Sequence, residues 1–130
     1  MAGMADTFAK ALQQTEESRN PEPLLQLFSE DAELQNLAMS HQGLDGARRF
    51  WETYLAQFDR IRSEFSHLIE SDDQVALVWT STGTLRDGQP ITYRGVSILE
   101  LDGDRVRRFE SVYDSAAFVR PESTAATGGS

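Results

Sequence analysis

The stretch that decides the fold is VALVWTSTGTLRDGQPITYRGVSILELDGDRVRRFESVYD, Val75–Asp114. It contains three long runs rich in Val, Ile, Thr, Tyr and Trp, the residues that favour strands. Two Asp-Gly pairs, Asp87-Gly88 and Asp102-Gly103, separate the runs and tolerate the positive φ angles of tight hairpins. The stretch therefore predicts a three-stranded antiparallel meander. Because such a meander is not stable alone, we expect the helical first half of the chain to cover it and to enclose a small apolar pocket.

Two helices are predicted near the N-terminus, the second of them short. Asp6 is placed to cap the first, which runs through FAKALQQTEESR and carries an apolar face made of Phe8, Ala11, Leu12 and Thr15. Asn20 and Pro21 then favour a second helix from Pro21 to Phe28. The segment AELQNLAMS follows as a short strand with Asn36 in its middle, where a hydrogen bond to neighbouring backbone explains the amide better than a functional role does.

The strongest helical pattern follows the turn Gly43-Leu44-Asp45-Gly46, with Asp45 as its expected cap. Its apolar side chains recur with a period near 3.6 and form one stripe: Ala47, Phe50, Trp51, Tyr54, Leu55 and Phe58. Core packing accounts for this stripe. It still permits Trp51 or Tyr54 to line a cavity.

Between Ile61 and Glu70 the apolar pattern changes to a period of two, which predicts a strand with Ile61, Phe65, His67 and Ile69 facing inward. An inward histidine is either a satisfied core residue or a pocket imidazole that exchanges a proton near neutral pH. His67 is therefore one candidate catalytic residue. His41, just before the long helix and near the expected cavity mouth, is the other.

The strands of the meander are apolar on both faces. Val96 and Ile98 alternate with Leu99 and Leu101, and Val75–Trp79 shows two equally apolar sets, so either set can face inward there. Because helices cover one face of a small sheet, a second copy of the chain is the economical cover for the other. We expect a homodimer through the outer sheet face.

The last strand places Arg107, Phe109, Ser111 and Tyr113 on one side. This set suits a pocket wall that ends in a phenol.

Composition excludes several classes of function. A net charge of −9 argues against nucleic acid and against anionic membranes, and the absence of Cys excludes disulfides and thiolate chemistry. No apolar run is long enough to span a bilayer, and MAGMADTF does not read as a signal peptide, which favours a cytoplasmic protein. No ligand spacing for a metal and no phosphate-binding or nucleophile motif is present, so we expect neither metal nor cofactor.

Three segments carry a resemblance to a known family: LLQLFSEDAELQN (Leu24–Asn36), GLDGARRFW (Gly43–Trp51) and DGDRVRRFESVYD (Asp102–Asp114). In this order they resemble the nuclear transport factor 2-like superfamily, in its SnoaL-like and ketosteroid-isomerase-like branch, over Phe8 to about Phe118. The resemblance implies an α+β fold, with a cone-shaped, curved mixed sheet wrapped on about three N-terminal helices around an internal cavity. It also implies frequent dimerisation. We expect one domain over residues 1–118 and a disordered tail over 119–130.

Activity transfers less well, because this superfamily carries many functions on one scaffold. By the match, Asn36 occupies the position of the ketosteroid isomerase base, and Leu12 occupies that of the phenol. The oxyanion-holding acid falls on Ser97, or on Val96 if the alignment slips by one. All three departures count against ketosteroid isomerase activity.

The resemblance and the apolar helix stripe together imply a cavity for a small hydrophobic, sparsely oxygenated molecule. The candidate ligand-binding residues are Leu12, Asn36, Trp51, Tyr54, Ser97, Phe109, Ser111 and Tyr113. Three functions stay open: acid–base chemistry of the isomerase, cyclase or hydrolase type on a carbonyl-bearing metabolite, ligand binding without chemistry, and a dimerising scaffold whose core is filled.

Overall fold

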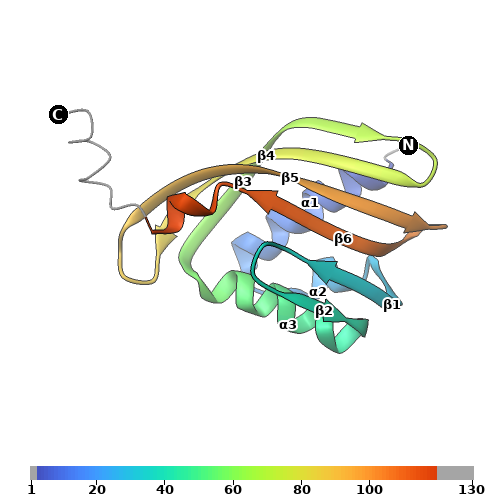
Figure 1. Cartoon of the computed structure of the whole chain (residues 1–130), viewed down its shortest axis with the longest axis horizontal. Coiled ribbons are helices and arrows are strands. Elements are labelled where there is room, and N and C mark those ends of the chain that lie inside the picture. Colours follow the sequence, from blue (N-terminus) through green and yellow to red (C-terminus); the bar gives the residue numbers. More distant parts are fainter. Residues whose placement is uncertain (1–2, 120–130) are drawn as a thin grey trace.

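One strongly curved sheet of six strands carries the helices on its concave side (Figure 1). This arrangement comes from a computed structural model that describes residues 3–119. The elements in chain order are α1 (Met4–Ser18), α2 (Glu22–Leu25), β1 (Phe28–Gln35), β2 (Ser40–Gln42), α3 (Gly43–Ala56), β3 (Phe58–Glu70), β4 (Gln74–Leu85), β5 (Pro90–Asp102), β6 (Arg105–Tyr113) and the 3₁₀ helix η1 (Ser115–Phe118).

The sheet is mixed, with strand order β2-β1-β6-β5-β4-β3. Strand β1 runs parallel to β6, whereas the other neighbouring pairs are antiparallel. The predicted meander is confirmed as β4–β5–β6. Its two Asp-Gly turns place Gly88 at φ 90° and Gly103 at φ 64°, a conformation that glycine adopts without strain. The α+β fold class expected from the sequence is thus confirmed.

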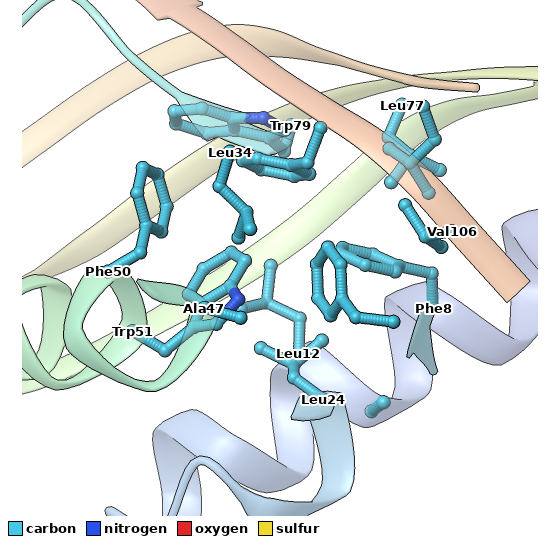
Figure 2. Packing of buried hydrophobic residues seen from close by; sticks show 14 of the residues in the cluster. Phe8, Leu12, Leu24, Leu34, Ala47, Phe50, Trp51, Leu77, Trp79 and Val106 are labelled. Carbon is cyan, nitrogen blue, oxygen red and sulfur yellow. The ribbon is translucent and has the colours of Figure 1, made fainter. Parts of the chain in front are cut away.

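Aromatic rings fill the space between α1, α3 and the sheet (Figure 2). Phe8 of α1 has its ring 5.7 Å from that of Phe109, 6.0 Å from that of Phe28 and 6.3 Å from that of Trp51. The Trp51 and Phe109 rings are 5.1 Å apart. These stacked, tilted and edge-to-face contacts join both helices to β1 and β6 in one core.

Burial settles which face of β4 looks inward. Val75, Leu77 and Trp79 are buried against the helices, whereas Ala76 and Val78 lie on the outer face. The sequence left this choice open, because both sets are apolar.

Several predicted boundaries are wrong. Helix α2 is a single turn, and the segment from Phe28 through Ser29-Glu30-Asp31 belongs to β1 instead of ending a helix. Strand β1 pairs with β6 at Phe28 and again from Glu33, with a register shift between them. Phe58 is the first residue of β3, although it is fully buried as the stripe required. Asn36 lies after β1, not within a strand. Its side-chain oxygen accepts the backbone N–H groups of Ala38 and Met39 and so forms the β1–β2 turn.

The two long helices do not use the caps expected from the sequence. Asp6 and Asp45 lie within first turns, and the N-cap positions are Gly3 and Gln42. The carboxylate of Glu70, at the end of β3, accepts the backbone N–H groups of Met4 and Ala5 at 3.2 and 2.8 Å instead. A distant strand therefore satisfies donors that the start of α1 leaves free.

Arg19 performs the matching role at the opposite end of α1. It adopts a left-handed conformation, φ 63°, and its guanidinium donates to the carbonyls of Leu55, Phe58 and Asp59. These bonds fix the end of α1 to the junction of α3 and β3.

No helix among residues 3–119 is long and apolar enough to cross a membrane. The predicted tail lies outside the described residues, apart from Val119.

Candidate functional site

A cavity of about 40 Å³ lies between the helices and the inner face of the sheet. It is lined by all eight residues named as ligand-binding candidates: Leu12, Asn36, Trp51, Tyr54, Ser97, Phe109, Ser111 and Tyr113. Further lining comes from Phe50, Gln57, Ser63, Trp79, Ser81, Tyr93 and Phe118. The wall is thus mainly aromatic, with hydroxyl groups set into it.

Four serines line the cavity from the sheet, in two pairs of directly opposed residues. Ser63 of β3 faces Ser81 of β4, and Ser97 of β5 faces Ser111 of β6. All four are buried. Small side chains at these positions leave room for the cavity, because large ones would meet across the concave face.

The Ser97 pair belongs to a hydrogen-bonded chain. The Trp79 indole donates to Ser97 Oγ at 3.0 Å, and Ser97 donates to Ser111 Oγ at 3.4 Å. The position aligned with the isomerase acid is therefore a hydroxyl inside the cavity, while Val96 faces outward.

Sequence reasoning missed a buried carboxylate next to this cavity. Glu16 of α1 is 4% exposed. Its Oε2 atom accepts the Tyr54 hydroxyl at 2.6 Å and the Ser63 hydroxyl at 2.5 Å, and its Oε1 atom accepts the Ser63 backbone N–H at 2.7 Å. Ser63 Oγ lies 2.6 Å from Ser81 Oγ. We call Glu16, Tyr54, Ser63 and Ser81 the Glu16 cluster.

A signal for Glu16 was present in the sequence. Glu16 follows Leu12 by four residues and Thr15 by one, so it falls on the apolar stripe of the first helix. A charged residue on a buried stripe needs partners. The partners could not be found from sequence, because Ser63 and Tyr54 lie 47 and 38 residues away along the chain.

Burial controls the ionisation of the groups around the cavity. It raises the pKa of Glu16, although hydrogen bonds from Ser63 and Tyr54 oppose the rise. Burial also raises the pKa of Tyr54, where the nearby charge of Glu16 adds to the effect. Burial also raises the pKa values of Tyr93 and Tyr113, because it removes their hydroxyl groups from water. The cavity therefore presents neutral phenols near neutral pH.

One side chain that lines the cavity has a buried polar atom without a partner among the described residues. The indole Nε1 of Trp51 is buried and makes no hydrogen bond, and the whole residue is 3% exposed. An indole N–H is a donor only, so what it needs is an acceptor.

Phe118 of η1 borders the cavity at the C-terminal end of the described chain. Its ring lies 4.8 Å from that of Tyr93 and 5.8 Å from that of Tyr113. Asp114 holds η1 in place by accepting the backbone N–H of Ala116 at 3.1 Å. A short element thus sets one aromatic side of the cavity.

The expected inward position of His67 is wrong. A β-bulge between Phe65 and His67 shifts the alternation of β3 by one residue, so His67 pairs with outward-facing Val78 and is exposed. Ile69 is likewise turned out, at 56% exposure. His41 is half-buried in β2, with its ring 6.5 Å from that of Phe50. Neither histidine is among the described residues that line the cavity.

Arg107 also departs from the expected pocket wall. A second bulge, opposite Glu100 and Leu101, interrupts the alternation of β6, so that Val106 and Phe109 are buried while Arg107 is exposed and pairs with Glu100 at 3.1 Å. The remaining members of that wall, Phe109, Ser111 and Tyr113, line the cavity as expected.

Within residues 3–119, no three His, Cys, Asp or Glu side chains come together in a way that could hold a metal ion.

Solved structures share this fold at low sequence identity. An NTF2-like protein from Burkholderia pseudomallei superposes with a TM-score of 0.80 at 16% identity, covering 92% of this chain and 98% of that one. A protein from Catenulispora acidiphila with a ketosteroid isomerase-like fold, solved in complex with trimethylamine, gives 0.79 at 14% identity, covering 89% and 92%. TerC, co-crystallised with polyporic acid, gives 0.75 at 20% identity, covering 89% and 93%.

No protein of curated function matches the sequence. A family model described as the SnoaL-like domain does match, over residues 7–109, which is most of the chain and includes α1, α3 and nearly all of the sheet. The chain belongs to the SnoaL-like domain family.

Proposed function

We propose that this protein binds a small, mostly apolar molecule that carries an oxygen acceptor, such as a carbonyl-bearing metabolite. The aromatic wall supplies apolar contact area, and the hydroxyl groups of Tyr54, Ser81 and Ser111 supply orienting hydrogen bonds. This combination is typical of small-molecule sites. It also favours ligand binding over a scaffold with a filled core, because a filled core does not require hydroxyl groups that face a cavity.

The observation that carries the proposal is the Trp51 indole. A buried donor without a partner costs about 1–3 kcal/mol, and a ligand oxygen that reached Nε1 after a shift of the neighbouring side chains would recover that free energy. Because Trp51 also contacts Tyr54 and Phe109 through its ring, its orientation is fixed before a ligand arrives.

The size of the cavity limits the ligand or requires a movement. About 40 Å³ holds about three water molecules, whereas drug-sized ligands occupy cavities of about 300–1,000 Å³. A ligand with more than a few heavy atoms therefore requires the ring of Phe118 to swing away from Tyr93. Phe118 is the natural candidate, since η1 is short and lies at the edge of the core.

The relatives provide probes. Polyporic acid was co-crystallised with TerC, and trimethylamine was found with the protein from Catenulispora acidiphila. The test is a titration of the purified protein with polyporic acid, followed by the fluorescence of its two tryptophans, Trp51 and Trp79, together with native mass spectrometry of the untreated protein.

We expect quenching that saturates, and an affinity about fivefold to 150-fold lower in Trp51→Phe, which keeps an aromatic ring and removes the N–H. Thr92→Ala, exposed on the outer side of β5, is the matched control. The absence of saturable binding together with the absence of a co-purified molecule would refute the proposal.

Acid–base chemistry is the second candidate function, favoured by Glu16. A carboxylate with a raised pKa, linked to the cavity through Tyr54 and Ser63, is suited to exchanging protons with a bound molecule. Under this function Glu16→Gln binds the ligand but loses deuterium exchange at carbon atoms next to its carbonyl group in D₂O. Equal deuterium exchange in the unmodified protein and in Glu16→Gln would exclude this role for Glu16 and leave ligand binding as the proposed function.

We also propose a homodimer through the outer sheet face. Two rows of opposed residues cross that face: His67, Val78, Val96 and Val112 in one, and Ile69, Ala76 and Ile98 in the other. Ile98 is 38% exposed and Val112 is 45% exposed. The second row continues to Glu110, opposite Ile98, so the patch is mainly apolar with His67 and Glu110 at its ends. An outward patch of this kind suits a two-fold interface.

A further inference from the structure

The Glu16 cluster fixes the direction of its hydrogen bonds. Tyr54 and Ser63 each have one hydroxyl hydrogen, and each donates it to Glu16 Oε2. Ser63 therefore has no hydrogen left for Ser81, so in the bond between the two serines Ser81 is the donor. The hydroxyl hydrogens of Tyr54 and Ser63 are thus donated to the carboxylate, and that of Ser81 is donated to Ser63, so none of the three is left for a ligand.

The cluster therefore offers a ligand in the cavity only the lone pairs of its hydroxyl oxygen atoms. Tyr54, Ser63 and Ser81 all line it, and their oxygen atoms can only accept further hydrogen bonds while Glu16 is ionised. The Tyr93 hydroxyl neighbours those of Tyr54 and Ser81, whose hydrogen bonding acts against the rise of its pKa. When Tyr93 donates to either of them, its own oxygen becomes one more acceptor.

Glu16 is also in reach of solvent on its other side. It forms part of a surface groove between α1 and the β3–β4 edge, whose other charged and polar members are Gln13, Glu17, Arg19, Arg60, Arg62, Thr82 and Thr84. Arg62 favours the ionised form of Glu16, and the cavity side adds the phenols of Tyr54 and Tyr93. A proton can reach Glu16 from this groove without crossing the cavity.

We propose that ionised Glu16 makes this part of the cavity wall selective for a ligand O–H or N–H donor, while the Trp51 indole takes an acceptor oxygen of the same molecule. The inference rests on the proposed ligand-binding function and narrows its ligand class to small molecules that carry both groups, such as hydroxy-carbonyl compounds. Protonation of Glu16 reverses the selectivity, because the carboxyl then donates to Tyr54 or Ser63 and frees a hydroxyl hydrogen to point inward.

Glu16→Gln resembles the protonated state at every pH, because the side chain donates hydrogen bonds to the hydroxyl oxygens; its amide donates two where the protonated carboxyl donates one. With the amide oxygen accepting the Ser63 backbone N–H, the amide nitrogen donates to the Tyr54 and Ser63 oxygens. Both hydroxyl hydrogens are then released toward the cavity. The substitution keeps the shape and the number of hydrogen bonds, so the fold is retained while the direction of donation changes.

The experiment compares phenol with its methyl ether, anisole, which lacks the donor. Both compounds are titrated by NMR into four proteins. These are the unmodified chain, Glu16→Gln, Phe118→Ala, which opens the cavity, and the double variant Phe118→Ala with Glu16→Gln. With Glu16 intact we expect phenol to bind about threefold to thirtyfold more tightly than anisole. Glu16→Gln removes that preference, and Ser81→Ala weakens phenol binding alone. Glu17→Gln, exposed on the same helix, keeps the preference.

A pH series adds an independent readout. The phenol preference of the protein with Glu16 intact falls as the pH is lowered through the raised pKa of Glu16, while the response of Glu16→Gln stays flat. Equal binding of phenol and anisole, or a preference that survives Glu16→Gln, overturns the inference and leaves the cavity as a ligand site. Failure of both probes to bind, even in Phe118→Ala, counts against the proposed function itself.

Discussion

At the scale of single residues, Glu16 carries the largest electrostatic consequence. Folding removes its carboxylate from water and returns three hydrogen bonds. The net effect is a raised pKa, so ionised Glu16 destabilises the fold relative to protonated Glu16. A residue of this kind at the edge of a cavity is a usual sign of a functional site.

The pH dependence of stability follows from that shift. The folded protein holds its proton on Glu16 to higher pH than the unfolded chain, whose ordinary pKa is 4.5. The stabilising effect of protonated Glu16 is therefore complete below pH 4.5 and is lost as the pH rises through the pKa of Glu16 in the folded protein. The loss in the free energy of unfolding is about 1.4 kcal/mol for each pH unit that separates the pKa values of the folded and unfolded states.

Measured by urea unfolding, Glu16→Gln should gain stability relative to the unmodified protein between pH 4.5 and pH 8. Glu17→Gln should show no such trend. A constant difference between Glu16→Gln and the unmodified protein across this range would contradict the raised pKa.

Phe118 borders the cavity, and we expect its ring to limit the access of ligands. Phe118→Ala removes the ring that packs on Tyr93 and Tyr113, and we expect faster association of polyporic acid in stopped-flow fluorescence. The loss of stability should stay below the roughly 3–5 kcal/mol typical of a fully buried phenylalanine, because Phe118 is only partly buried. Val119→Ala, at an 81% exposed position, is the control. Unchanged association rates would mean that ligands enter elsewhere.

At the scale of elements, strand β3 explains why alternation misplaced His67. Ser63 and Phe65 obey the period of two on the inner face, and the bulge then exchanges the faces for the rest of the strand. One extra residue moves every later side chain to the other side. Bulges depend on the partner strand, so the local pattern carried no warning of it.

Helix α1 depends on the same strand for its start. Glu70→Ala removes the acceptor of two backbone N–H groups, and we expect a loss of about 1 kcal/mol in the free energy of unfolding. Glu64→Ala, exposed on β3, should change it by less than about 0.5 kcal/mol. Chemical denaturation of both variants measures these changes in the free energy of unfolding. Equal effects would show that Glu70 does not act as a cap.

At the scale of the whole molecule, we expect the outer face of the sheet to form the proposed dimer interface. Ile98→Lys places a charge in the apolar rows, and burying that charge at an interface is strongly unfavourable. We expect sedimentation analysis to show a dimer for the unmodified chain and a folded monomer for Ile98→Lys. Thr92→Lys, also exposed on the outer side of β5 but outside the rows, should stay dimeric. A monomeric unmodified chain at high concentration would refute the interface.

Sequence reasoning reached most of the cavity but not its chemistry. The aromatic stripe of α3 and the alternation of β6 lead to Trp51, Tyr54, Phe109, Ser111 and Tyr113, because each pattern repeats over several residues. The Glu16 cluster was missed because its members come from α1, α3, β3 and β4, and a single residue on each element forms no pattern.

The sequence by itself determined the meander, its two Asp-Gly turns, the long amphipathic helix and the SnoaL-like character of the chain. These follow from local backbone preferences and from apolar periodicity, which act over a few residues. Only the tertiary structure decided which face of β4 is buried, where the bulges turn His67 and Arg107 outward, and how Glu16 meets Ser63. Those outcomes depend on strand register and on contacts between elements that are distant in the sequence. The free energy of burying a charge or a row of apolar side chains depends on these contacts, which local sequence patterns do not specify.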